Sequence, residues 1–219
     1  MRCLCIGVKA LMKKFTWYHR AWAAVGSVAL ALSLAACGGG GGNNVVLSAA
    51  EIDGLVFMRE EEKLAHDVYV YLYGLWPVES IFLTISVSET SHTEAILTLL
   101  QKYGIPDPAA GKLPGEYTDT DLQALYNTPV VMGQTNEIEA LKVGGLIEET
   151  DIRDINAKKR VTTVEQILSV YDRLLCGSRN HLRGFDARLD ALAVTYVPSV
   201  LTQAEWDAIA NTPMETCSI

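Results

Sequence analysis

Apolar residues recur at intervals of three and four along four long segments of the chain, which is the spacing of helices that bury one face. The four segments begin at Ser48, after Ser80, near Asn136 and after Thr163. Alternating apolar and polar positions, the sign of a strand, are almost absent. The pattern therefore predicts an all-α domain in which four long helices pack side by side.

The connections between these segments differ in length, and the difference specifies a topology. A tight turn at 76–80, which contains Pro77, joins the first helix to the second. About 32 residues separate the second helix from the third, a long connection in which we expect a short helix around 119–126. A capping box at Thr202 and Glu205 predicts a short C-terminal helix outside the bundle. A long crossover after the second helix is typical of a ferritin-like antiparallel four-helix bundle, which is the predicted fold.

Each predicted helix interrupts its apolar stripe near the middle with side chains that bind protons or metals. The interruptions are Glu62 in the first helix, Glu89 and His92 in the second, Glu148 in the third, and Ser178 and His181 in the fourth. If the helices pack side by side, these groups meet in one layer of the core. Glu60, Glu61 and Glu149 lie off the stripes, and we expect them to be solvated.

A layer of buried carboxylates needs compensation, because an unpaired buried charge is costly. A divalent or trivalent cation would supply that compensation. Inward-facing Glu residues with a Glu-x-x-His pair form the ligand set of dinuclear iron or manganese bundles, and Glu89 and His92 have this spacing. The alternative is a metal-free polar network, in which Arg179 and Arg183 join the histidines in pairing with the glutamates.

The first 36 residues are typical of a leader. From Met12, basic residues precede a short apolar run and then small residues, which is the order of a secretory signal peptide. The run ends in Leu-Ala-Ala-Cys, which resembles the lipobox of bacterial lipoproteins and implies lipidation of Cys37; simple cleavage nearby is the alternative. By the same resemblance, Gly38 favours the outer membrane, with the domain facing the periplasm.

After the leader, residues 37–46 are predicted to form a glycine-rich tether and residues 47–219 the helical domain. Five of the 18 basic residues lie in the leader, which leaves 13 basic against 26 acidic residues and a formal charge of −13. Such a surface repels nucleic acid and attracts cations, so nucleic acid is not an expected partner. Cys176 and Cys217 remain in the domain, and the sequence leaves open whether they pair.

Four motifs occur in order along the domain: MREEEKLAHDVYVYLYGLW, SETSH, GGLIEETDIRDI and GSRNHLRGF. Together they resemble the ferritin-like family of prokaryotes catalogued as domain of unknown function 2202. The resemblance extends from about Leu47 to the end of the chain. It implies a ferritin-like fold related to rubrerythrin-type metal proteins, and it implies no established reaction.

Two positions depart from the pattern of that family. Where its members have Arg, this chain has His66, four residues after Glu62, which is either an added ligand or a partly exposed neighbour. Ser178 stands where rubrerythrin-like sites have the Glu of Glu-x-x-His. We expect Asp151, three residues after Glu148, to replace that carboxylate.

The predicted metal ligands are Glu62, Glu89, His92, Glu148, Asp151 and His181. The predicted function is that of an envelope lipoprotein that binds iron or manganese and oxidises ferrous iron or reduces peroxide or oxygen. The alternative, from another class, is a non-catalytic periplasmic binding or metal-sequestering module with a metal-free polar core. The expected partners are metal ions and, through the lipid anchor, the membrane; the oligomeric state stays open, a dimer included.

Overall fold

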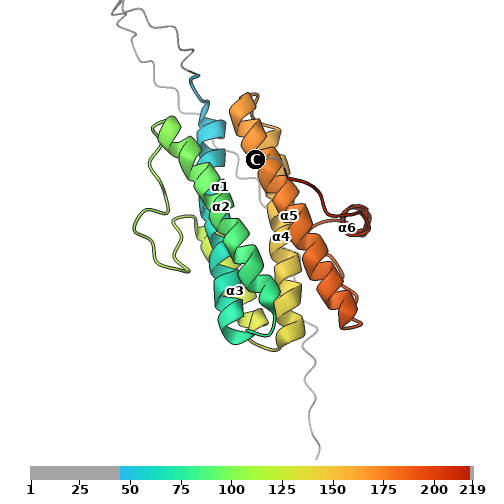
Figure 1. Ribbon diagram of the computed structural model, residues 1–219. Helices are drawn as coiled ribbons and strands as arrows, with labels where there is room; N and C mark the ends of the chain where they lie inside the picture. The colour runs from blue at the N-terminus through green and yellow to red at the C-terminus, as the bar shows by residue number, and fades with distance from the viewer. Residues whose placement is uncertain (1–44, 218–219) are drawn as a thin grey trace, which may run out of the picture. The chain divides into compact units, whose positions relative to one another are not determined.

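Helices make up all the regular structure of residues 45–217, the part of the chain that the computed structural model describes (Figure 1). They are α1 (Ala49–Leu75), α2 (Ser80–Lys102), α3 (Thr120–Gly133), α4 (Glu137–Lys159), α5 (Glu165–Ala191) and α6 (Gln203–Ala210). No strand occurs in these residues, so the all-α class predicted from the sequence is confirmed for them. Within the same residues, no helix is both long and apolar enough to span a membrane.

Three predictions concern the N-terminal part of the chain. The leader (1–36), the lipidated Cys37 and nearly all of the tether (37–46) lie outside the described residues. They stay predictions.

Side chains just before α1, α4 and α6 accept hydrogen bonds from free N–H groups of the first turn, whereas α2 and α5 begin without a side-chain cap. Ser48 begins α1 in a capping box with Glu51, and Thr202 begins α6 in a second capping box with Glu205. Asn136 begins α4 by accepting a hydrogen bond of 3.0 Å from the backbone N–H of Glu139. The predicted starts of these three helices are therefore supported by capping hydrogen bonds.

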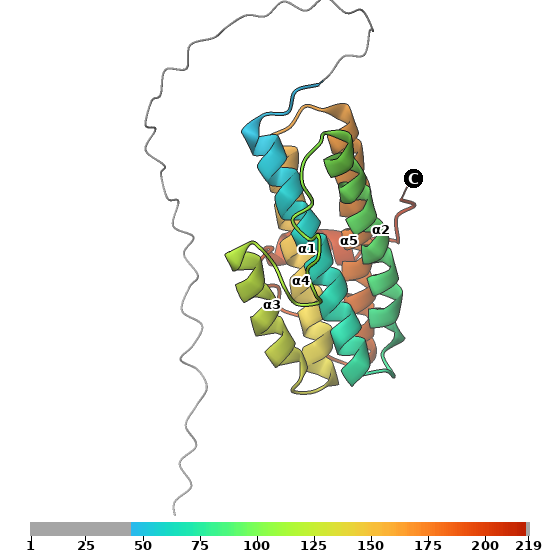
Figure 2. The same ribbon diagram turned by 90° about the vertical axis from the view of Figure 1, so that its left-hand side faces the viewer.

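The four long helices, α1, α2, α4 and α5, lie side by side and form a bundle (Figures 1 and 2). An aromatic cluster fills the core at one level of the bundle. The ring centroid of Tyr69 lies 5.5 Å from that of Phe185 and 6.3 Å from that of Phe82. Gly144 allows this packing, because a Cβ atom at that position would lie 2.3 Å from the Phe185 ring.

The helix in the crossover, α3, is longer than expected, since it ends at Gly133 rather than near residue 126. Asp119 caps it by accepting hydrogen bonds from two backbone N–H groups. The helix lies beside α1 and α4 (Figure 2). At its end, the Trp76 indole N–H donates a hydrogen bond of 2.8 Å to the carbonyl of Gly133. Packing against the bundle thus extends α3 through Pro129, where the sequence pattern alone favours an earlier end.

The chain after α5 returns along that helix and is held there covalently. As expected, α6 lies outside the bundle, against α5 (Figure 1). Its Trp206 stacks on Tyr196 with a centroid distance of 4.3 Å. Cys176 of α5 forms a disulfide with Cys217, which answers the question that the sequence left open.

All three glutamates expected to be solvated, Glu60, Glu61 and Glu149, are buried, so that expectation was wrong. Glu60 accepts hydrogen bonds from the backbone N–H groups of Thr118 and Asp119 in the crossover. Glu149, which is fully buried, accepts a hydrogen bond of 2.6 Å from the Tyr196 hydroxyl and further bonds from the backbone N–H groups of residues 199–201. These off-stripe faces are covered by connecting segments instead of by water.

Substitution of Glu149 with Ala should destabilise the protein by about 3 kcal/mol, because it leaves the N–H groups of residues 199–201 without their acceptor. Denaturant unfolding followed by circular dichroism measures the change. The matched control is Glu139→Ala on the same helix, which removes a partly exposed ion pair with Lys142 and should cost less than about 1 kcal/mol. Equal effects of the two substitutions would contradict the anchoring role of Glu149.

Candidate metal centre

Two groups of three side chains meet in the core of the bundle and share one carboxylate. Glu62, Glu89 and His92 form the first triad, and Glu89, Glu148 and His181 form the second. Within each triad the potential ligand atoms all lie within 4.8 Å of one another, and every member is buried. The stripe interruptions of α1, α2, α4 and α5 therefore converge on one layer.

Glu89 lies between the two histidines and faces each with a different oxygen. Nδ1 of His92 lies 2.9 Å from Oε2 of Glu89 and 3.2 Å from Oε2 of Glu62. Nδ1 of His181 lies 2.8 Å from Oε1 of Glu89 and 3.4 Å from Oε2 of Glu148. The two imidazole rings stack with a centroid distance of 5.6 Å. Each half of the site thus has one nitrogen, its own carboxylate and a share of Glu89.

Side chains outside the triads fix the orientation of their members. The Tyr69 hydroxyl is hydrogen-bonded to Oε1 of Glu148, so the aromatic cluster holds that carboxylate in place. Nε2 of His181 lies 2.9 Å from the hydroxyl oxygen of Ser88, which leaves Nδ1 as the ring nitrogen directed at the carboxylates. Partners of this kind are what orient the ligands of protein metal sites.

Asp151 lies in the same layer but outside both triads. Its Oδ2 is hydrogen-bonded to the hydroxyl of Ser178, the residue that occupies the position of the missing glutamate, and its Oδ1 has no partner. The structure thus brings five of the six predicted ligands into the triads and leaves Asp151 beside them.

Other residues considered from the sequence lie away from the triads. The His66 side chain is 36% exposed, and its Nδ1 lies 3.2 Å from Oδ1 of Asp67. Arg179 and Arg183 both bind the carboxylate of Glu215 near the C-terminus. The metal-free alternative is therefore wrong in one part, because these two arginines do not pair with the core glutamates.

Gly177 is a residue of the site that sequence reasoning missed. A Cβ atom at this position would lie 2.4 Å from Nε2 and 2.6 Å from Cε1 of His92, so the imidazole packs directly on the backbone of α5. The only signal in the sequence was a glycine next to Ser178 inside a predicted helix. Glycine weakens the interior of a helix, so its presence there indicates a packing requirement.

The charges of this layer depend on one another. Burial raises the pKa of Glu62 to about 7 even though His92 opposes the shift. Burial opposes ionisation of Glu89 as well, yet His92 and His181 hold its pKa below the usual range. For His181, burial favours the neutral ring, but Glu148 and Glu89 outweigh it and raise the pKa to about 9. In the metal-free protein, protons on the imidazoles thus balance the charge of the carboxylates.

Several buried polar atoms of the layer have no hydrogen-bond partner, and their chemistry tests whether a cation fits the site. Oε1 of Glu62, Oε2 of Glu89, Oδ1 of Asp151 and Nδ1 of His181 are buried and make no hydrogen bond. His181 Nδ1 and Glu89 Oε2 have close neighbours of opposite charge, but not in the directions that a hydrogen bond requires. Carboxylate oxygens and imidazole nitrogens left in this way match the donor set of iron and manganese, so the residues fit such an ion.

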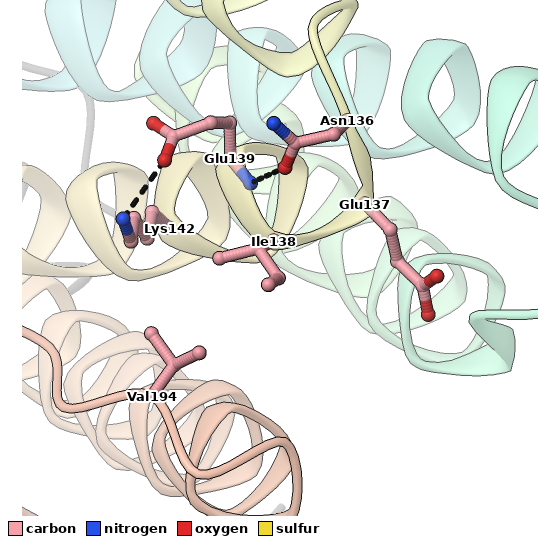
Figure 3. A pocket seen from close by; sticks show the side chains of 6 residues that line it. All are labelled: Asn136, Glu137, Ile138, Glu139, Lys142 and Val194. Carbon is pink, nitrogen blue, oxygen red and sulfur yellow. Dashed lines mark hydrogen bonds and ion pairs between the residues drawn. The ribbon is translucent and has the colours of Figure 1, made fainter.

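A surface hollow at the N-terminal end of α4 has no comparable chemistry (Figure 3). It is lined by Asn136, Glu137, Ile138, Glu139, Lys142 and Val194. Its charged side chains Glu139 and Lys142 already pair at 2.8 Å. Glu137 precedes Glu148 by eleven residues on one helix, which corresponds to about 16 Å. The hollow is therefore separate from the triads, and the core layer is the candidate functional site.

Substitution of Gly177 with Ala should displace the His92 imidazole and destabilise the protein by about 1–3 kcal/mol, because the new methyl group overlaps the ring. Thermal unfolding measures the loss. Gly74→Ala in α1 is the matched control, since its Cβ has open space and should leave the stability unchanged or slightly higher. A Gly177→Ala protein as stable as the Gly74→Ala protein would contradict the close packing of His92.

Comparison with known proteins gives concordant results. The protein is 40% identical over 169 residues to "Uncharacterized protein MJ0754" of Methanocaldococcus jannaschii, a match that covers 77% of this chain and 91% of the relative. The crystal structure of hypothetical protein MJ0754 from Methanococcus jannaschii DSM 2661 has a similar fold. Its TM-score is 0.76 at 39% identity, over 80% of this chain and all of that one. The family model described as "Uncharacterized protein domain (DUF2202)" matches residues 51–213, and the chain belongs to that family.

Proposed function

We propose that this protein is a ferritin-like metalloprotein that binds iron or manganese at the two triads and uses the metal to oxidise ferrous iron or to reduce peroxide or oxygen. The observation that carries the proposal is the sharing of Glu89 between the triads, each of which also offers one imidazole and a carboxylate of its own. Two adjacent positions with a common carboxylate are the arrangement of dinuclear carboxylate bundles.

Glu62 and His92 would hold one ion and Glu148 and His181 the other, with Glu89 common to both. Asp151 would serve one of these positions, as its unpartnered Oδ1 favours. Bound iron or manganese would supply the one-electron redox chemistry that the protein side chains lack.

The surrounding residues would orient and shield the metal ligands. Tyr69 holds Glu148 by its hydroxyl, and Ser88 holds His181 by Nε2, so each ligand keeps one orientation whether or not an ion is bound. Tyr69, Phe82 and Phe185 close the core on one side of the layer and exclude water from it. A dry, charged site of this kind strengthens electrostatic interactions with a bound cation.

The ferritin-like assignment of the bundle and the position in the cell belong to the same proposal. A short turn between α1 and α2 and a long crossover before α4 support the ferritin-like topology. The Leu-Ala-Ala-Cys sequence that ends at Cys37 supports a lipid anchor on the periplasmic side of the outer membrane. The disulfide between Cys176 and Cys217 is consistent with an oxidising compartment.

Elemental analysis of the protein purified without chelator should find about two iron or manganese ions per chain. Because Glu89 is common to both triads, Glu89→Gln should lose both ions, whereas Glu62→Gln should lose only one. Helical circular dichroism checks that each variant is folded, and Glu139→Gln on the surface of α4 should retain the full metal content. Absence of metal from the wild-type protein, even after anaerobic loading with ferrous iron, would favour the non-catalytic module with a metal-free core.

The stability of the chelator-treated protein should fall as the pH rises. The folded protein binds more protons than the unfolded chain, because Glu62 has a pKa raised from 4.5 to about 7 and His181 one raised from 6.5 to about 9. The loss of stability caused by Glu62 develops as the pH rises from 4.5 to about 7. The stabilisation by protonated His181 is complete below pH 6.5 and is lost as the pH rises through about 9. Thermal unfolding at pH values from 5 to 9, a range of about four units, measures how steeply the stability falls with pH.

Excess manganese should offset this decline, because metal ligands bind in their deprotonated forms. The double variant Glu62→Gln/His181→Gln should show a shallower decline without metal, since two of the groups with raised pKa values are removed. A chelated wild-type protein with equal stability at both ends of the range would contradict this account of the layer.

A further inference from the structure

The hairpin formed by residues 70–93, the end of α1 and the first half of α2, lies wholly within the described part of the chain and exposes no charged side chain. Its only acidic and basic residues, Glu79, Glu89 and His92, are buried. The next charge on the solvent side of α2 is Glu94. The domain as a whole is strongly acidic, with 26 acidic against 13 basic residues. The hairpin surface therefore differs in kind from the rest of the domain.

Aliphatic and hydroxyl side chains take the place of charges on this surface. Four aliphatic side chains are between 45% and 75% exposed: Val70, Val78, Leu83 and Val87. Thr84 and Thr90 of α2 are exposed as well, and the hydroxyl of each donates a hydrogen bond of 3.1 Å to the backbone carbonyl four residues earlier. Because these donors are satisfied within the helix, the surface can leave water at little cost.

The exposed aliphatic residues belong to one continuous surface. The two helices lie side by side (Figure 2), and the rings of Tyr69 and Phe82 stack between them with a centroid distance of 6.3 Å. The next residues along each helix, Val70 and Leu83, are therefore at the same level. Val87 follows Leu83 by one helical turn on the same face of α2. From Ser80 to Ser91 this uncharged face of α2 is about 18 Å long.

A second copy of this chain is the partner that such a surface fits. A large net charge of one sign keeps protein molecules apart. A two-fold contact places each patch opposite an identical patch, so an acidic patch would meet another acidic patch, whereas the uncharged hairpin avoids that repulsion. A membrane surface is a poorer match, because helices that bind membranes carry Lys or Arg beside their apolar face, and residues 70–93 contain neither.

We infer that two copies of this protein associate through the hairpin of residues 70–93, as a two-fold dimer in which the α2 helices pack against each other. Glu89 and His92 project from the buried side of α2, so the candidate metal centres of the two copies lie on either side of the paired helices. A contact about 18 Å long is small for a protein interface, so the dissociation constant should be micromolar. The inference does not rest on the proposed function, because the contact requires no metal.

Sedimentation velocity of the purified protein at concentrations from about 1 to about 200 µM tests the inference, and the wild-type protein should shift from monomer to dimer over this range. Val87→Glu should weaken the association about 10- to 100-fold, because the two-fold axis brings two carboxylates together. The matched control is Val131→Glu on α3, where the valine is 65% exposed against 62% for Val87, and it should associate as the wild type does. Both variants keep the same N-terminal segment, so a lipid anchor cannot cause a difference between them.

A mixing experiment separates lost association from lost folding. Val87→Lys should also be monomeric, but an equimolar mixture of Val87→Glu and Val87→Lys should associate more strongly than either variant alone, since opposite charges then meet across the contact. A wild-type protein that stays monomeric throughout the range, or a Val87→Glu protein that associates as the wild type does, would overturn the inference. Monomeric wild-type protein that binds phosphatidylglycerol vesicles, with binding lost in Val87→Glu, would also overturn it and assign the hairpin to a membrane surface.

Discussion

Burial of several carboxylates and imidazoles in one layer of a helical bundle is the constraint on which the rest of this structure depends. An isolated charge in that position would cost several kcal/mol of desolvation, a large part of the net stability of most domains. The layer persists because the groups neutralise one another: Glu89 lies between His92 and His181, which in turn contact Glu62 and Glu148. The cation that we propose would replace these protons and meet ligands already in position.

The remainder of the domain holds this layer in register. The aromatic cluster of Tyr69, Phe82 and Phe185 closes it on one side, and the backbone at Gly177 closes it against His92. Acidic side chains also fasten the irregular segments, since Glu60 binds the crossover and Glu149 binds the chain before α6. The carboxylates of this acidic domain thus have two roles. Some accept hydrogen bonds from backbone N–H groups and anchor connecting segments, and others lie in the core as potential metal ligands.

Membership in the DUF2202 family relates this chain to an uncharacterised protein of Methanocaldococcus jannaschii and implies no reaction. The chemistry therefore has to be argued from the site itself.

The sequence by itself determined the four long helices, two capping boxes and the five predicted ligands that meet in the triads, because helical periodicity reports which side chains face the helices of the same bundle. It did not determine which other faces are covered. Glu60 and Glu149 are buried by segments that have no periodicity of their own, and Arg179 is drawn away to Glu215. The position of Asp151 beside the triads, the contact between Gly177 and His92, and the disulfide between Cys176 and Cys217 also depend on distances between helices and on the path of the tail. Only the tertiary structure fixes these distances and this path, because they depend on contacts between residues far apart in the chain, which no local sequence pattern reports.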